Sequence, residues 1–387
     1  MFQALQEQAP DILLQLIKLH KADPRPDKID VGVGVYRDQL GTTPVFGAVK
    51  IAEAQLLEQQ SSKSYLGADG DIGFVERLAP IVFGERRAIS DGLWGLQTPG
   101  GTGALRLAAD LIARANPEAT IWLWTPTWPN HPPILRDAGL RMTAFPAYDV
   151  ASSTLDWAAI ENALSNAKAG DALLIQAGCH NPTGADPNAD QWRRIGEICQ
   201  KQGLLPLIDS AYQGLGNGLD EDVAGLRILV DAVDEAIITY SCDKNFGLYR
   251  DRVGALWVKS GLKRLEAVRS NLFELARAMW SMPPDHGAAV VRLILESDTL
   301  TAAWHSELGD MRERINAIRA ALSSADRGLS FIANQRGLFA MLPLSPEQVQ
   351  RLRHEHGIYM APSGRANLAG LTIQDIPRFV SAMQSVM

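Results

Sequence analysis

The feature that most constrains this chain is a polar loop that directly follows a short apolar run. Residues 236–239, Ala-Ile-Ile-Thr, are typical of a buried strand, and Ser241, Lys244 and Arg252 follow it. In α/β folds the residues that contact ligands gather at strand ends, so this order indicates a site. If Lys244 is buried there, the loss of hydration lowers its pKa and leaves an amine able to act as a nucleophile.

Two segments offer groups that suit a phosphate. Ser241 supplies a hydroxyl and Arg252 a fork of guanidinium donors. The run 100–103, Gly-Gly-Thr-Gly, begins a predicted helix that ends near residue 115, and the free amides and dipole of a helix N-terminus attract anions. Each segment also fits a plainer interpretation, an ordinary polar loop or a tight turn that merely begins a helix, and neither decides alone.

Periodicity predicts further elements along the chain. Helices are expected over 11–18, 43–60 and 262–279, and buried strands over 121–124, 173–175 and 204–208. Residues 31–36 alternate glycine with branched residues, which fits a strand that glycine weakens or a backbone that approaches a ligand closely.

Five segments taken together carry a much stronger signal than any one of them. They are 98–106 (TPGGTGALR), 128–131 (WPNH), 180–184 (HNPTG), 241–252 (SCDKNFGLYRDR) and 363–365 (SGR). Their order and spacing resemble the class I, fold-type I aminotransferases, which use pyridoxal 5'-phosphate, and the resemblance covers nearly the whole chain. It implies an α/β fold: a large domain with a mostly parallel seven-stranded sheet flanked by helices, plus a smaller α/β domain. The implied division is an N-terminal arm and part of the small domain in 1–40, a large cofactor-binding domain in 41–300 and a small C-terminal domain in 301–387.

The resemblance also implies roles for side chains in a ping-pong transamination through a Lys244 Schiff base. Once freed, Lys244 moves the substrate's α-proton, while Asp209 keeps the ring nitrogen protonated and His131 orients Asp209. Tyr65 reaches the phosphate of a neighbouring subunit, which implies a homodimer with shared active sites. The implied catalytic residues are Lys244, Asp209 and Tyr65. The implied cofactor-binding residues are Gly101, Thr102, Trp128, Asn181, Asp209, Tyr212, Ser241, Lys244, Arg252 and Tyr65. The implied substrate-binding residues are Gly34, Trp128, Asn181, Arg277 and Arg365.

Two positions depart from the pattern of the family. Asp243 stands where the family more often has serine, and its carboxylate can raise the pKa of Lys244 or disturb the phosphate. Because adjacent side chains usually diverge, we expect a modest effect. Gln176 stands where relatives often carry histidine behind His131, which weakens the network that orients Asp209.

The amino donor is the harder question. Arg277 matches an arginine that binds the side-chain carboxylate of aspartate or glutamate from the other subunit. Met279, Trp280 and Met282 make this wall more apolar than in strict aspartate enzymes, and Arg37 and Ser64 also differ from that pattern. The resemblance is therefore to bacterial aromatic aminotransferases acting on tyrosine and phenylalanine, and on aspartate as well, with 2-oxoglutarate as acceptor. Aspartate aminotransferase is the alternative, and a non-catalytic pyridoxal-phosphate-binding protein a remote one.

Composition excludes several other classes. The net charge of -7 and the lack of a basic patch argue against a nucleic-acid partner. Arg37 replaces the third glycine of a dinucleotide fingerprint, and the short arm leaves no room for the DNA-binding module of a regulator. His354-Glu355-His356 is too compact for a zinc site, so no metal is expected. The three cysteines, the lack of a signal peptide and the lack of a long apolar run predict a cytoplasmic protein that does not enter membranes.

Overall fold

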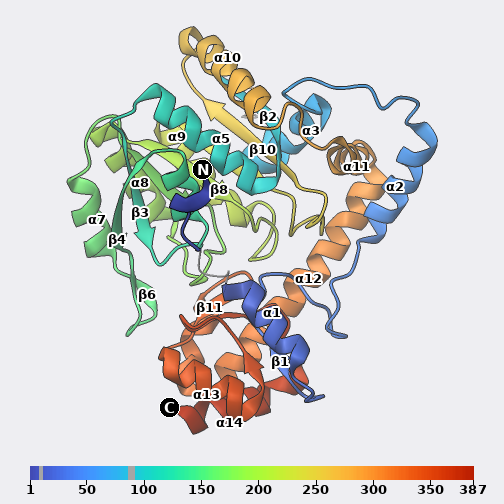
Figure 1. Ribbon diagram of the computed structural model, residues 1–387, viewed down its shortest axis with the longest axis vertical. Helices are drawn as coiled ribbons and strands as arrows, with labels where there is room; N and C mark the ends of the chain where they lie inside the picture. The colour runs from blue at the N-terminus through green and yellow to red at the C-terminus, as the bar shows by residue number, and fades with distance from the viewer. Residues whose placement is uncertain (8–11, 86–91) are drawn as a thin grey trace.

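A seven-stranded sheet forms the centre of the larger part of the molecule (Figure 1). The structure is a computed structural model that describes residues 1–7, 12–85 and 92–387. The strands of the sheet are β2 (Leu93–Pro99), β3 (Thr120–Thr125), β4 (Arg141–Pro146), β7 (Ala172–Gln176), β8 (Leu205–Ser210), β9 (Ala236–Ser241) and β10 (Val253–Lys259). Short pairs join β1 (Ile29–Asp30) to β12 (Ile358–Tyr359), β5 (Tyr148–Asp149) to β6 (Thr154–Leu155), and β11 (Phe339–Met341) to β13 (Arg365–Asn367).

The strand order in the sheet is β2-β10-β9-β8-β7-β3-β4. Strand β10 runs antiparallel to both of its neighbours, and the other pairs are parallel. The predicted mostly parallel seven-stranded sheet is confirmed. Parallel strands bring their carboxyl ends to one edge, so β7, β8 and β9 end side by side.

Helices cover both faces of this sheet (Figure 1). The helices are α1 (Ile12–Ala22), α2 (Gly47–Gln59), α3 (Ile72–Phe83), α5 (Gly100–Ala115), α6 (His131–Asp137), α7 (Trp157–Ser165), α8 (Ala189–Gln202), α9 (Ala224–Ala232), α10 (Leu262–Met279), α11 (Asp285–Glu296), α12 (Asp298–Ala325), α13 (Pro346–His356) and α14 (Ile376–Val386). Neighbouring strand residues point to opposite faces: Leu174 joins the apolar cluster under α5 and α10, while Leu173 and Ile175 join the one under α8, α9 and α11. Both faces of the sheet are therefore buried, as is usual for parallel sheets.

A second hydrophobic core lies in the C-terminal part of the chain. It combines residues 29–31 with residues of 318–386, including side chains of α13 and α14. The long helix α12 joins the two cores, since Trp304 and Ile315 pack in the sheet cluster and Ile318 and Leu322 in the C-terminal one. The domain boundaries at residues 40 and 300 stay predictions.

Several predicted elements need correction at their ends. Helix α2 begins at Gly47 rather than at residue 43, and Pro44 disfavours the helical conformation of the residue before it. Residues 31–36 form no strand, and β1 ends at Asp30. Helix α1 begins at Ile12 and runs past residue 18, and the predicted residue 11 lies outside the described part. The helix over 262–279 is confirmed. Among the described residues no helix is both long and apolar enough to cross a membrane.

Candidate active site

The carboxyl ends of β7, β8 and β9 line a cavity at the edge of the sheet. Its lining residues are Gly101, Thr102, Leu105, Trp128, Gln176, Asn181, Asp209, Ala211, Tyr212, Ser241, Asp243 and Lys244. Eight of them were predicted as site residues from the sequence. Segments 140 residues apart in the chain thus meet because the parallel strands place their ends together.

Lys244 lies inside this cavity, in the loop after β9. Its Nζ is 5.1 Å from the centre of the Tyr212 ring and 3.9 Å from Asp243 Oδ2. Burial lowers the pKa of the Lys244 amine, and the negative charges of Asp243 and Asp209 act in the opposite direction. The lysine is thus a buried amine whose protonation depends on two nearby carboxylates.

Asp209 is held on both of its carboxylate oxygens. Oδ1 accepts a hydrogen bond from Thr239 Oγ1 at 3.0 Å, and Oδ2 lies 3.2 Å from His131 Nε2. The contact with Thr239 follows from strand pairing, since Asp209 and Thr239 are partners in the register of β8 and β9. On its other side, His131 Nδ1 is 2.7 Å from Thr127 Oγ1. Asp209 therefore points a fixed negative charge into the cavity.

A chain of polar contacts links the cavity to Arg365. Asn181 Nδ2 donates to Tyr212 Oη at 3.1 Å, and Arg365 Nη1 donates to Asn181 Oδ1 at 3.5 Å. The Arg365 guanidinium is buried, lies 5.0 Å from the Phe339 ring centre and donates to Gly32 O at 2.9 Å. Its Nε has no hydrogen-bond partner among the described residues. A buried cation with a free donor is suited to bind an anion such as a carboxylate.

The opposite end of the cavity gathers donors for a second anion. Helix α5 begins there, and Gly101 and Thr102 of its first turn line the cavity beside Ser241. The Arg252 guanidinium crosses close to the backbone at Gly100, where an added Cβ would come within 2.6 Å of Arg252 Nη2. Gly100 also has a φ of +70°, so glycine is required on both grounds.

The sequence and the fold both match known proteins. The family model of aminotransferase class I and II matches residues 26–383. The chain belongs to this family. A tyrosine aminotransferase of Rhizobium meliloti is 52% identical over 376 residues, which are 96% of each chain. An aspartate aminotransferase of Salmonella typhi is 42% identical over the full length of both. An aromatic-amino-acid aminotransferase from Burkholderia pseudomallei, solved covalently bound to pyridoxal phosphate, superposes with a TM-score of 0.96 at 34% identity, covering 100% of this chain and 99% of that one.

Six predicted site residues of the aminotransferase do not line this cavity: His131, Arg252 and Arg365 adjoin it through the contacts given above, and Gly34, Tyr65 and Arg277 lie elsewhere. Tyr65 is 89% exposed, and Arg277 is exposed at the end of α10, where it donates to Ser281 Oγ. Gly34 lies instead against Phe339, whose ring an added Cβ would approach to 3.1 Å. The described residues of one aminotransferase chain thus do not bring Tyr65 and Arg277 to their own cavity.

Sequence reasoning missed several side chains that shape the site of the aminotransferase. Thr239 and Thr127 hold Asp209 and His131, and Phe339 lies under Arg365. Gln176 was named from the sequence for a place behind His131, but its hydrogen bonds go to the backbone of Asn181, accepting from its N at 2.9 Å and donating to its O at 2.8 Å. For Thr239 the signal was present, because it ends the apolar run directly before the polar loop.

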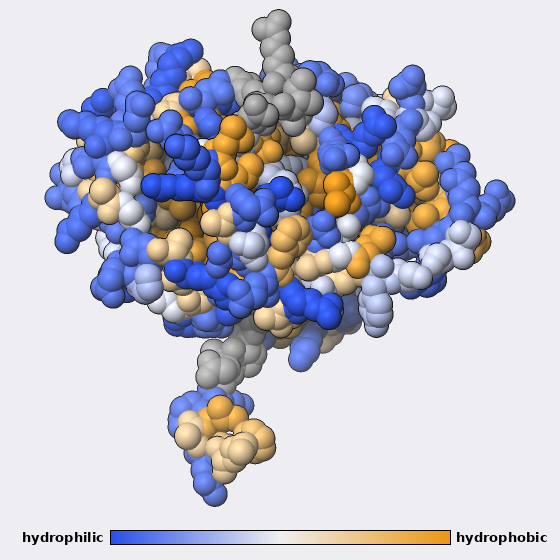
Figure 2. Space-filling model, turned by 90° about the horizontal axis from the view of Figure 1, so that it is seen from above, coloured by the Kyte–Doolittle hydropathy of each residue, from blue (hydrophilic) through white to orange (hydrophobic). Residues whose placement is uncertain are grey.

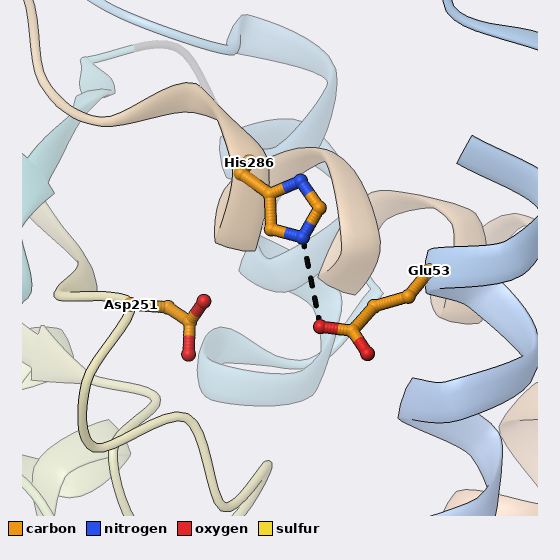
Figure 3. Close-up of side chains that lie close together, drawn as sticks. All are labelled: Glu53, Asp251 and His286. Atoms are coloured by element: carbon orange, nitrogen blue, oxygen red, sulfur yellow. Dashed lines mark ion pairs between the residues drawn. The ribbon is translucent and has the colours of Figure 1, made fainter. Parts of the chain in front are cut away.

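A separate group of side chains resembles a metal site only superficially. Glu53, Asp251 and His286 bring one possible ligand atom each within 4.8 Å of the others, and the ion pair between Glu53 and His286 measures 3.5 Å (Figure 3). His286 is exposed and the other two are half-buried. Exposed carboxylates commonly gather in this way without a metal, so this group supports no metal site.

Proposed function

We propose that this chain transaminates aromatic amino acids, tyrosine and phenylalanine, and also aspartate, with 2-oxoglutarate as amino acceptor and pyridoxal phosphate as cofactor. The observation that carries this proposal is that the Lys244 amine and Asp209 line one cavity with Thr102 and Ser241, and that Asn181 of the same lining contacts Arg365. The reaction needs these groups together: an amine, a negative charge facing a pyridinium, and seats for a phosphate and a carboxylate.

The side chains present fit this cofactor. At one end Thr102, Ser241 and the first turn of α5 suit a phosphate. Elsewhere in the lining the charge of Asp209 suits a protonated ring nitrogen, and Trp128 offers an aromatic face. When bound, pyridoxal phosphate supplies the electron sink that makes loss of the substrate's α-proton feasible.

The chain's own residues then divide the remaining work. Lys244 first holds the cofactor and then, as a free amine, removes the proton from the substrate's α-carbon. Arg365 binds the substrate's α-carboxylate through a planar fork, which a lysine would not offer. Asn181 and Tyr212 are held together by a hydrogen bond, and we expect this pair to orient the cofactor's ring. His131 keeps Asp209 in place.

The substrate range rests on the wall near Arg277 and on the relatives. Met279 and Trp280 are half-buried beside it, and Met282 accepts a hydrogen bond from the Leu66 amide at its Sδ. Such adaptable apolar side chains suit an aromatic ring. The Rhizobium relative is named a tyrosine aminotransferase. Aspartate aminotransferase remains the second candidate, because Arg277 is exposed and suited to a second carboxylate and the Salmonella relative carries that name.

We also propose a cytoplasmic homodimer with shared active sites. Residues 1–7 project from the body in Figure 2 and expose Met1, Phe2 and Leu5. Tyr65 and Leu66 are exposed as well and line one open hollow of the surface. Apolar side chains exposed together mark a surface that another protein covers. A second copy would bury the arm and could bring Tyr65 and Arg277 to the neighbouring cavity.

Steady-state kinetics with 2-oxoglutarate test this function. We expect turnover with tyrosine, phenylalanine and aspartate, and a higher kcat/KM for the two aromatic donors. A higher kcat/KM for aspartate would favour the second candidate. Binding of the cofactor without turnover of any amino acid would contradict both and leave a non-catalytic binding protein.

A further inference from the structure

Asp243 places a negative charge at the end of the cavity where the cofactor's phosphate is proposed to bind. Its side chain is buried and lines the cavity together with Gly101, Thr102 and Ser241. Its backbone amide donates to Ser241 Oγ at 3.2 Å, so the two residues are neighbours at this end of the cavity. A phosphate at this end of the cavity must therefore lie beside a carboxylate.

The positive charge at this end is already shared. Arg252 Nη1 donates to Asp243 Oδ2 at 2.9 Å and to Tyr249 O at 2.9 Å, and Lys244 Nζ is 3.9 Å from the same Oδ2. The other titratable groups near Asp243 are neutral at neutral pH, because burial raises the pKa of each: Cys242, Tyr212 and Tyr249. Arg252 is thus the cation that Asp243 already binds, and the Lys244 amine faces the same carboxylate oxygen.

The two carboxylate oxygens of Asp243 differ in their hydrogen bonding. Oδ1 is buried and has no hydrogen-bond partner in the described part of the chain, whereas Oδ2 is bound to Arg252. A buried carboxylate oxygen without a donor is unfavourable, and a phosphate dianion brought next to it adds repulsion. A single proton between the two groups removes both penalties, since it lowers the summed charge by one and gives Oδ1 a short O–H···O hydrogen bond.

We propose that Asp243 and the cofactor's phosphate share one proton, so that cofactor binding takes up a proton from solvent. No other bond changes in this step: the proton joins the pair of anions when the complex forms and returns to solvent when it dissociates. Free phosphate monoesters lose their second proton near a pKa of about 6, so the uptake is expected above neutral pH, where the free ligand is a dianion. The inference rests on the cofactor proposed above and not on the amino donor.

Titration calorimetry of the cofactor-free protein tests this. Pyridoxamine 5'-phosphate is the probe, because it forms no covalent bond with Lys244. Binding in two buffers of different ionisation enthalpy counts the protons taken up, and the wild type is compared with Asp243→Ser. Above pH 7 we expect the wild type to take up about one proton more, and its Kd to rise about tenfold more per pH unit than that of the variant.

Two further variants make the result decisive. Asp243→Asn keeps the shape of the side chain and replaces Asp243→Ser if the latter fails to fold. Asp251→Asn removes a carboxylate of the same loop that points toward Glu53 and His286, outside the cavity, and should titrate like the wild type. Equal proton counts and equal pH dependence in the wild type and Asp243→Ser would overturn the proposal. Failure of every variant and of the wild type to bind the probe would instead contradict the cofactor.

Discussion

At the scale of single residues, the site depends on a lysine kept in a setting that disfavours its charge. Burial lowers the pKa of Lys244, while Asp243 and Asp209 raise it. These opposing effects matter because catalysis by a general base is most efficient when its pKa is close to the working pH.

Replacing this amine should remove catalysis without removing the cofactor. For Lys244→Ala we expect turnover to fall by about a hundredfold to ten-thousandfold, the range for loss of a general base. Pyridoxal phosphate should still bind, because the groups at the phosphate end remain. Lys263→Ala, an exposed lysine of α10, is the control. Unchanged turnover of Lys244→Ala with tyrosine would refute the role given to this lysine.

Arg277 should matter for acidic donors and little for aromatic ones. With Arg277→Ala we expect kcat/KM for aspartate to fall by about tenfold or more, as for the loss of one charged hydrogen bond, and that for tyrosine to change less than about threefold. Arg264→Ala, at the other end of α10, is the matched control and should change neither. An equal loss for both donors would mean that Arg277 acts on the fold and not on the substrate.

The residues proposed to take part in the reaction could be predicted from the sequence, but the side chains that hold them in place could not. Lys244, Asp209 and Asn181 follow apolar runs, and strand ends of a parallel sheet meet. Thr239 holds Asp209 only because of the register between β8 and β9, which the sequence does not give. The expectation that Asp243 and Lys244 diverge was wrong: both side chains line the cavity, with Oδ2 and Nζ 3.9 Å apart.

At the scale of elements, the loop after β7 is fixed by buried polar groups. His180 Nε2 accepts from Trp124 Nε1 at 2.7 Å, and His180 Nδ1 is 2.8 Å from Thr183 Oγ1. Asp186 accepts from the amides of Cys179 and His180. The loop carries Asn181, so these contacts place one side chain of the cavity. The sequence assigned Asn181 to the site only through resemblance, and the contact of His180 with Trp124 of β3 could not be inferred from the residues of the loop.

This loop should make stability depend on pH. Burial lowers the pKa of His180 to about 3, so its contribution is complete above pH 6.5 and is lost as pH falls, because only the unfolded state takes up the proton. Burial raises the pKa of Asp186 to about 6, which acts in the opposite sense and destabilises the protein as pH rises toward 6. Comparing His180→Gln with the wild type isolates the contribution of His180, because Asp186 is present in both proteins.

For His180→Gln we therefore expect a smaller loss of stability on acidification. Between pH 7.5 and pH 5 the wild type should lose about 2 kcal/mol through this histidine, and the variant should not. Urea unfolding at a fixed protein concentration measures the difference. Parallel losses in both proteins would show that His180 does not carry this pH dependence.

At the scale of the whole molecule, one chain lacks part of the proposed site. Tyr65 and Arg277 lie on the surface, while the cavity holds Lys244 and Asp209. The sequence predicted this division only through resemblance, since exposure of a residue cannot be inferred from its own segment. A symmetric dimer repeats each contact twice, so each copy can complete the other's site.

Mixed dimers test this division. Lys244→Ala and Arg277→Ala subunits, each weak toward aspartate alone, are unfolded together and refolded as a mixture. Half of the dimers should be hybrids, and each hybrid should have one intact site out of two. About a quarter of the wild-type aspartate activity should therefore return. Activity that stays at the mean of the two parents would mean that Arg277 serves its own chain.

The most direct test of the account is a single half-reaction. The protein loaded with pyridoxal phosphate is mixed with tyrosine, and separately with aspartate, without 2-oxoglutarate, and the visible spectrum of the cofactor is followed. We predict that both amino acids convert the aldehyde form to the amine form, tyrosine faster, and that Lys244→Ala does so far more slowly. Conversion by aspartate alone would contradict the aromatic specificity, and no conversion by either would contradict the function itself.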